Sequence, residues 1–266
     1  MGRGAPRVGA PAGAALLDPL LRRAPAPRRR RKRGAFGRAQ AAVVARARRA
    51  GLIGGAADPA PVAAVDATGL DARHASAHYR YAYSAGYRAA YAQLHPGRRP
   101  ARPHYRPGHP KLTAVVHARS HLILGAVPGV GPAHDTPDFA PAMRQAAALL
   151  AFAAVAADAG YDAEHCHALG REALGIPATA IALNRRTHGR RWPATPYRRA
   201  MRRAFPRALY RQRRRAERAF SQHKRRLGAA LTARSTPAQM RELTLRVLTH
   251  NLSLLHRASK GFQQSR

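Results

Sequence analysis

Short apolar runs alternate along this chain with segments whose apolar positions recur at helical spacing. Such runs, four to eight residues long and bounded by polar or turn-forming residues, predict buried strands. Two of them are separated only by Arg119 and Ser120, which predicts a tight β-hairpin. Two others each end at an aspartate, Asp66 and Asp158. The predicted strands are residues 62–66, 111–118, 121–127, 152–157 and 178–183.

Helical periodicity fills the intervals between and after these strands. The predicted helices are residues 136–150, 162–174, 207–228 and 237–256. At the start of the first, Thr136 is the expected N-cap, with Pro137 in the first turn and Asp138 near the positive end of the helix dipole. The order strand, hairpin, helix, strand, helix, strand, helix, helix predicts an α/β fold with a mixed sheet and helices on both faces.

Three segments lack these patterns. Residues 71–110 are rich in Tyr, His, Arg and Pro, and predict loop with one short helical stretch near Gly86–Leu94. Residues 184–206 predict a basic, turn-rich connection. Residues 1–58 are rich in Ala, Arg, Pro and Gly, and their basic run 28–33 is expected to stay extended unless phosphate neutralises it. One short helix is expected at residues 37–50. We therefore expect a basic arm or degenerate DNA-binding region at 1–58, a main domain at 59–258 and a tail at 259–266.

The net charge of the chain indicates which kind of molecule it binds. The chain has 48 Lys and Arg against 12 Asp and Glu, a formal net charge of +36, which indicates a polyanion and above all nucleic acid. A membrane partner is not expected, because no basic amphipathic helix carries interfacial aromatic anchors and the apolar run 146–157 is too short to span a bilayer. The single cysteine, Cys166, excludes an intrachain disulfide framework and favours a reducing, cytoplasmic location.

The predicted helix 207–228 carries a specific pattern, Y-x2-R-x3-E-x6-K. Its four residues are Tyr210, Arg213, Glu217 and Lys224. At about 100° per residue, offsets of 3, 7 and 14 place them within roughly a 60° arc of the helix. An acid flanked by cations on one helical face can bind a metal while its neighbours hold phosphate. The alternative is a solvated basic helix with a local ion pair.

This pattern resembles the signature of the DDE transposases of bacterial insertion sequences. That family has two upstream aspartates, the first at the end of a strand and the second in a D-x-G-[FY] motif. Asp66, after the apolar run 62–65, matches the first, and Asp158-Ala-Gly160-Tyr161 matches the second. The resemblance covers about residues 60 to 258. It implies a ribonuclease-H-like fold and makes residues 59–258 a catalytic domain.

The resemblance also implies a chemistry. Asp66, Asp158 and Glu217 would be the catalytic residues and the ligands of two Mg²⁺ ions, with Mn²⁺ as a substitute. Carboxylates suit hard cations, and two ions roughly 3.5–4 Å apart can stabilise both the attacking and the leaving oxygen. Arg213 and Lys224 would hold phosphates and Tyr210 would orient the DNA backbone. The implied partners are double-stranded DNA, as element ends and target, and a second copy of the chain in a homodimer assembled on DNA at the nucleoid.

Several alternatives stay open. Asp66 and Asp158 could be ordinary turn residues, and Asp162 competes for the second acidic position, although we assign it to the N-cap of the next helix. Trp192 could stack on a base of DNA, but a partly buried loop anchor is the favoured interpretation. The aromatic and basic stretch 78–106 could follow DNA or cover the active face. At the level of function, the alternatives are a metal-dependent nuclease without strand transfer and a non-catalytic nucleic-acid-binding relic of a transposase.

Overall fold

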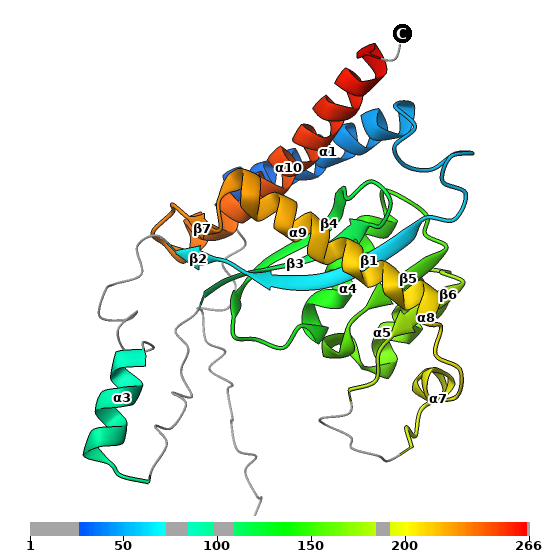
Figure 1. The fold of residues 1–266 in the computed structure, drawn as a ribbon. Coiled ribbons are helices and arrows are strands. Elements are labelled where there is room, and N and C mark those ends of the chain that lie inside the picture. Colours follow the sequence, from blue (N-terminus) through cyan, green and yellow to red (C-terminus); the bar gives the residue numbers. More distant parts are fainter. Residues whose placement is uncertain (1–26, 73–84, 98–108, 185–191, 265–266) are drawn as a thin grey trace, which may run out of the picture. The chain divides into compact units, whose positions relative to one another are not determined.

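The structure, a computed structural model, describes residues 27–72, 85–97, 109–184 and 192–264 (Figure 1). The chain divides after Gly37 into two units, and the sheet and the candidate site belong to the second, Arg38–Arg266. Most of the stretch 78–106, for which we considered a DNA contact, lies outside the described residues.

A five-stranded mixed sheet organises this unit. Its strands are β1 (Val62–Gly69), β3 (His109–His117), β4 (Ile123–Gly131), β5 (Ala154–Ala157) and β6 (Ala178–Ile181). They lie in the order β4-β3-β1-β5-β6. The strands β4, β3 and β1 pair antiparallel, whereas β5 and β6 run parallel to β1. All five predicted strands are therefore present, and the predicted α/β class with a ribonuclease-H-like mixed sheet is confirmed.

Helices cover the sheet and a small second sheet joins its end. The helices are α1 (Pro27–Arg49), α3 (Ala85–Leu94), α4 (Thr136–Ala147), α5 (Glu164–Ala168), α7 (Pro196–Arg203), α8 (Arg207–Tyr210), α9 (Arg214–Leu227) and α10 (Thr236–Gln264). Strands β2 (Asp71–Ala72) and β7 (Ala230–Leu231) pair parallel. Among the described residues, none of the helices is long and apolar enough to cross a membrane.

The two faces of the sheet are packed differently. Side chains alternate between faces along a strand, so Ala63 and Val65 of β1 point to one side and Ala64 and Asp66 to the other. The first side joins a core of larger residues with α4, and there Gly125 of β4 is required, because a Cβ would lie 2.1 Å from the Ala142 carbonyl oxygen. Helix α9 packs against β1 and β3 and crosses the sheet in front of β1 in Figure 1.

Small residues allow this close approach of α9. On the sheet, alanines occupy the α9 side of β1, β3, β5 and β6 at positions 64, 114, 156 and 180, and all four are buried. On the helix, Ala216, Ala219 and Phe220 are buried. Because these four positions are alanines, α9 can pack closely on the strands, and the charge of Glu217 in its first turn acts on Asp66 of β1.

Several predicted helices differ in detail. The predicted helix 162–174 is divided into α5 and a π-helical turn at Leu169–Ala173, and a 3₁₀ turn at Ala159–Tyr161 precedes it. Gly170 lies in the π turn and lets it approach Thr179 of β6, since a Cβ would lie 3.1 Å from the Thr179 methyl group. The predicted helix 207–228 is interrupted by a 3₁₀ turn at Arg211–Arg213, between α8 and α9.

Two further predictions were wrong. Residues 184–206 were expected to be a connection only, but they contain α7, which has no buried side chain and only a short apolar stripe of Tyr197, Ala200 and Met201. The N-terminal helix begins at Pro27 and so includes the basic run 28–33, which was expected to be extended. From Gln40 onward α1 packs on the core through Val43, Val44 and Ala47.

Candidate catalytic site

Asp66 and Asp158 lie side by side where the parallel pairing of β1 with β5 ends. Asp158 follows the last residue of β5, whereas Asp66 lies within β1, which continues to Gly69 and does not end at Asp66 as predicted. The ladder between β1 and β5 ends at the pair Val65–Ala157, and each aspartate is the next residue along its strand. Asp66 lies on the α9 side of the sheet, since it follows Ala64 by two residues, and Asp158 has the same relation to Ala156. The fold therefore brings together two carboxylates that are 92 residues apart in the sequence.

The environment of Asp66 is unusual for an aspartate. Loss of hydration on burial raises the pKa of Asp66 to about 6, and the negative charges of Asp158 and Glu217 act in the same direction. The Ala67 backbone N–H, which donates to Asp66 Oδ1 at 2.8 Å, and the positive charge of Arg213 lower it. Asp158, Glu217 and Arg213 are thus all electrostatic neighbours of Asp66.

Asp158 is held by the turn that follows it. Its Oδ1 accepts a hydrogen bond from the Gly160 backbone N–H at 2.8 Å, which caps the 3₁₀ turn. A Cβ on Gly160 would lie 3.0 Å from Asp158 Oδ1 and 3.2 Å from Oδ2 of a further acid, Asp135. The glycine of the D-x-G motif therefore leaves room for two carboxylates, one on each side.

Asp135 is a neighbour of the site that the sequence analysis missed. Lys111, which is buried within β3, donates from Nζ to Asp135 Oδ1 at 2.9 Å and lies 3.0 Å from Asp138 Oδ2. Desolvation lowers the pKa of Lys111, but the bonds to the two acids outweigh it, so the pKa is raised. A lysine inside an apolar strand was the available signal, because a buried charge requires a partner.

The same contacts correct the start of α4. Asp135 occupies the N-cap, but its side chain binds Lys111 and caps no backbone N–H. Thr136, predicted to be the N-cap, is the first helical residue, and its hydroxyl donates to the Gly160 carbonyl at 3.0 Å. Thr136 therefore ties the start of α4 to the turn that carries Asp158, and Asp135 ties it to β3.

Glu217 reaches the site from the first turn of α9. Its Oε1 is 2.7 Å from Arg213 Nη1, and half of the Glu217 side chain is exposed. The Arg213 guanidinium also lies 5.7 Å over the Tyr210 ring, which in turn meets Phe205 edge-on at 4.9 Å between centroids. Tyr210, Arg213 and Glu217 thus form one continuous contact chain beside Asp66.

The sequence model of the family described as "Transposase DDE domain" matches residues 58–252. The chain belongs to this family. No curated protein and no solved structure matches the chain. Membership confirms the resemblance seen in the sequence, and it makes DNA the polyanionic partner that the charge of this DDE domain indicated.

The remaining predicted DNA-binding residues of the DDE domain lie apart from the acids. Lys224 is partly exposed in the last turn of α9, next to Arg225 and Arg226. Trp192 is 62% exposed, and the Arg202 guanidinium lies 5.7 Å over its ring. The interpretation of Trp192 as a partly buried loop anchor is therefore wrong. The following residue, Pro193, is the buried one.

Asp162 does not cap a helix. The N-cap of α5 is Ala163, and the Asp162 carboxylate accepts hydrogen bonds from Arg198 Nε at 2.7 Å and Nη2 at 3.0 Å. The Asn184 backbone N–H donates to the same carboxylate at 2.7 Å. Both oxygens of Asp162 are thus occupied within the protein.

The donor set where β1 and β5 cease to pair suits a hard divalent cation of the kind that the family uses. Asp66 and Asp158 offer adjacent carboxylates, one of them desolvated, and Mg²⁺ prefers such oxygen ligands. Within the described parts of the chain, however, no group of three or more His, Cys, Asp or Glu side chains is arranged to hold a metal ion. Glu217 Oε1 is paired with Arg213, and half of the Glu217 side chain is exposed.

Proposed function

We propose that the protein is a DNA transposase that cuts DNA at the ends of an insertion sequence and joins those ends to target DNA. Asp66, Asp158 and Glu217 are its proposed catalytic residues. The observation that carries the proposal is the in-register placement of Asp66 and Asp158, with Glu217 and Arg213 as electrostatic neighbours of Asp66. Family membership supplies the reaction class.

The reaction has two phosphoryl-transfer steps. In the first, water attacks a phosphorus at the element end, the bond to the 3′ oxygen breaks, and that oxygen leaves as a hydroxyl after taking a proton. In the second, the new 3′ hydroxyl attacks a phosphorus of the target strand and displaces another 3′ oxygen. Neither step forms a covalent bond to the protein.

The three carboxylates are the proposed ligands of two Mg²⁺ ions, for which Mn²⁺ substitutes. Such ions, when bound, stabilise the charge that develops on the attacking and leaving oxygens. The raised pKa of Asp66 is consistent with this role, because a desolvated carboxylate beside two like charges gains most from a cation.

Arg213 and Lys224, the two cationic residues of the signature, are proposed to hold DNA at this site. Arg213 lies between a carboxylate and an aromatic ring, and its planar guanidinium can exchange the Glu217 oxygen for a phosphate oxygen. Such an exchange frees Glu217 for its own role. Lys224 would bind a phosphate farther along α9. Tyr210 would fix Arg213 and contact the DNA backbone. The exposed Trp192 would contact DNA away from the three carboxylates.

The assembly follows from the reaction. Joining two element ends requires two catalytic sites, so we infer a homodimer that forms on DNA, in the cytoplasm at the nucleoid. Residues 59–258 are the proposed catalytic domain, preceded by a basic DNA-binding arm or degenerate domain at 1–58 and followed by a tail at 259–266.

A non-catalytic DNA-binding relic is the second candidate. It is favoured by the ion pair that holds Glu217 on Arg213 and by the lack, among the described residues, of a ready three-ligand group. A metal-dependent nuclease without strand transfer differs from our proposal only in the second step.

The test is a cleavage and strand-transfer assay on the element's own end sequence with Mg²⁺ or Mn²⁺. Wild type is compared with Glu217→Ala and with Asp71→Asn, which changes an exposed acid of the same domain. We expect cutting and joining in wild type and Asp71→Asn, and neither in Glu217→Ala, while all three bind DNA. Cutting without joining would identify the nuclease. Equal binding without cutting in all three would identify the relic.

A further inference from the structure

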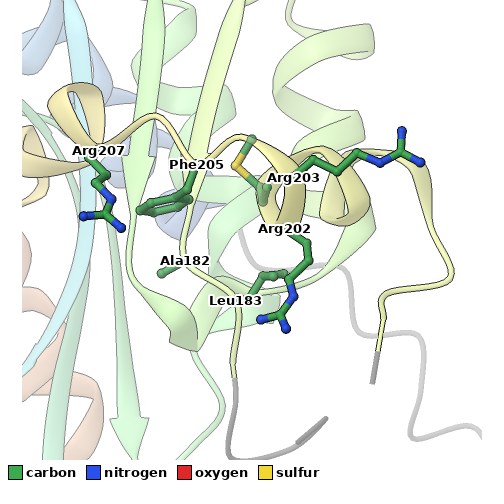
Figure 2. A pocket seen from close by; sticks show the side chains of 7 residues that line it. Ala182, Leu183, Arg202, Arg203, Phe205 and Arg207 are labelled. Atoms are coloured by element: carbon green, nitrogen blue, oxygen red, sulfur yellow. The ribbon is translucent and has the colours of Figure 1, made fainter. Parts of the chain in front are cut away.

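A cationic pocket of about 460 Å³ lies next to the catalytic acids, beyond the end of β6 (Figure 2). Ala182 and Leu183 come from the segment after β6, Phe205 from the connection between α7 and α8, and Arg202 and Arg207 from those two helices. Met201 and Arg203 of α7 also line the pocket. Figure 2 shows Arg202 and Arg207 on opposite sides of the Phe205 ring, whereas the Arg203 side chain points away from them. The pocket thus combines an apolar floor with two flanking guanidinium groups.

Strand register fixes where this pocket lies relative to Asp158. The ladder between β5 and β6 pairs Ala157 with Ile181, so Ala182 follows β6 as Asp158 follows β5. Adjacent strands are about 4.8 Å apart, which places the floor of the pocket one strand beyond Asp158. Phosphates of one DNA strand advance by about 3.4 Å per nucleotide. The pocket is therefore within one to three nucleotides of a phosphate at the acids.

The helix that forms one side of the pocket is held by acids and not by apolar packing. No side chain of α7 is buried. Its N-terminal turn is bound by Asp162, which accepts two bonds from Arg198, and by Glu164, which accepts the Tyr197 and Arg198 backbone N–H groups at 2.9 and 3.2 Å. The Tyr197 hydroxyl donates to Glu172 at 2.9 Å.

These contacts fix α7 without neutralising its far end. Three of only 12 acids in the chain bind the first turn of α7. In the part of the chain that the structure describes, neither Arg202 nor Arg207 has an acidic partner in an ion pair. Their charges are therefore available to a bound anion, at a position that the three acids hold in place.

We propose that this pocket binds one nucleotide of a DNA strand that passes the catalytic acids, within three nucleotides of the cleaved bond. Arg202 and Arg207 hold its phosphate by charge-assisted hydrogen bonds, and the Phe205 ring and Leu183 contact its sugar. The proposal rests on the proposed function, because it takes the acids to mark the cleaved bond. It assigns to Asp162, Glu164 and Glu172, which bind the first turn of α7, the role of positioning this subsite.

The experiment measures DNA binding without divalent metal, so that it does not depend on cleavage. A set of duplexes carries the element end. Each duplex has one uncharged methylphosphonate, and its position differs from duplex to duplex, from four nucleotides before to four after the cleaved bond. Their affinities are measured for wild type, for Arg202→Gln/Arg207→Gln and for the control Arg203→Gln, all at the same salt concentration. Thermal unfolding verifies that the variants are folded, as expected for exposed positions.

We expect one position within three nucleotides of the cleaved bond at which the methylphosphonate weakens binding of wild type and Arg203→Gln by about tenfold. The double variant should bind that duplex and the unmodified duplex equally well. Equal position profiles in all three proteins would overturn the proposal. If the expected profile is found in a wild-type protein that never cuts DNA with Mg²⁺, the pocket stands and the proposed catalysis does not.

Discussion

Asp66 and Asp158 occupy equivalent positions on adjacent parallel strands, each one residue beyond the last pair of the ladder that joins β1 to β5. This relationship places two carboxylates on one face of the sheet, where the parallel pairing of β1 with β5 ends. The burial that follows, together with the charges of Asp158 and Glu217, raises the pKa of Asp66 to about 6. When no cation is bound, the charged Asp66 carboxylate therefore lowers the stability of the folded protein, and this effect can be measured.

Replacing Asp66 by Asn should stabilise the metal-free protein at neutral pH. The pKa of Asp66 rises from 3.8 to about 6 on folding, so between these values the folded state binds more protons than the unfolded state, and stability falls as pH rises. Above pH 6 the full penalty is present, and below 3.8 it is absent. Thermal unfolding in EDTA should show a higher Tm for Asp66→Asn at pH 7.5 and a vanishing difference near pH 4. A constant difference at every pH would contradict this prediction.

Gly160→Ala should impair catalysis more than it impairs folding. The new methyl group would lie 3.0 Å from Asp158 Oδ1 and 3.2 Å from Asp135 Oδ2, so the two carboxylates must move apart. Contacts of this length require a shift of a few tenths of an ångström. Since a displacement of about 1 Å at a catalytic group can lower a rate by about 100-fold, we expect a smaller but measurable loss of rate. The measurement is the cleavage rate beside the Tm. Gly129→Ala, which meets no atom within 4 Å, is the control and should keep both values. Full activity of Gly160→Ala would show that this turn tolerates the shift.

Asp135→Asn should weaken the response to the divalent cation, although the residue is not one of the three proposed ligands. Asp135 shares Lys111 with Asp138, but Asp135 Oδ2 faces Gly160 and Asp158 Oδ1, whereas Asp138 Oδ2 accepts a bond from the Thr113 hydroxyl at 3.0 Å. Loss of a residue that supports a metal ligand lowers metal affinity or activity by about 10–100-fold. The Mg²⁺ concentration for half-maximal cleavage should therefore rise in Asp135→Asn.

Asp138→Asn is the matched variant for that experiment. It removes the other acid that binds Lys111, so it should lower the Tm without changing the Mg²⁺ dependence. The same rise in the required Mg²⁺ concentration in both variants would indicate that Lys111, and not Asp135, sets the geometry of the site.

Gly125→Ala should destabilise the domain. Its methyl group would lie 2.1 Å from the Ala142 carbonyl oxygen of α4, and a backbone atom cannot rotate away as a side chain can. Overpacking of this kind costs about 1–3 kcal/mol or more. Denaturant unfolding of Gly125→Ala and of Gly129→Ala, on the same strand, measures the effect. A difference below about 0.5 kcal/mol would mean that α4 can shift away from β4.

The predicted strands, the hairpin and the long helices were confirmed because each depends on local periodicity. The signature on helix 207–228 was equally local, since its four residues are fixed by helical spacing. Helix α7 was missed because its position depends on contacts with residues that are distant in the sequence. It is held by Asp162, Glu164 and Glu172, which lie 25 to 36 residues away along the chain, and it buries no apolar side chain. Periodicity carries no information about such contacts.

By itself the sequence determined the order of the elements, the class of the fold and the family, because these follow from apolar spacing and from the spacing of Tyr210, Arg213, Glu217 and Lys224. Only the tertiary structure decided the environment of each acid. Arg198, which binds Asp162, is 36 residues away along the chain, and the burial of Asp66 requires α9 to pack on β1. Charge and hydration depend on what surrounds a side chain in space, and residues distant in the sequence provide those surroundings.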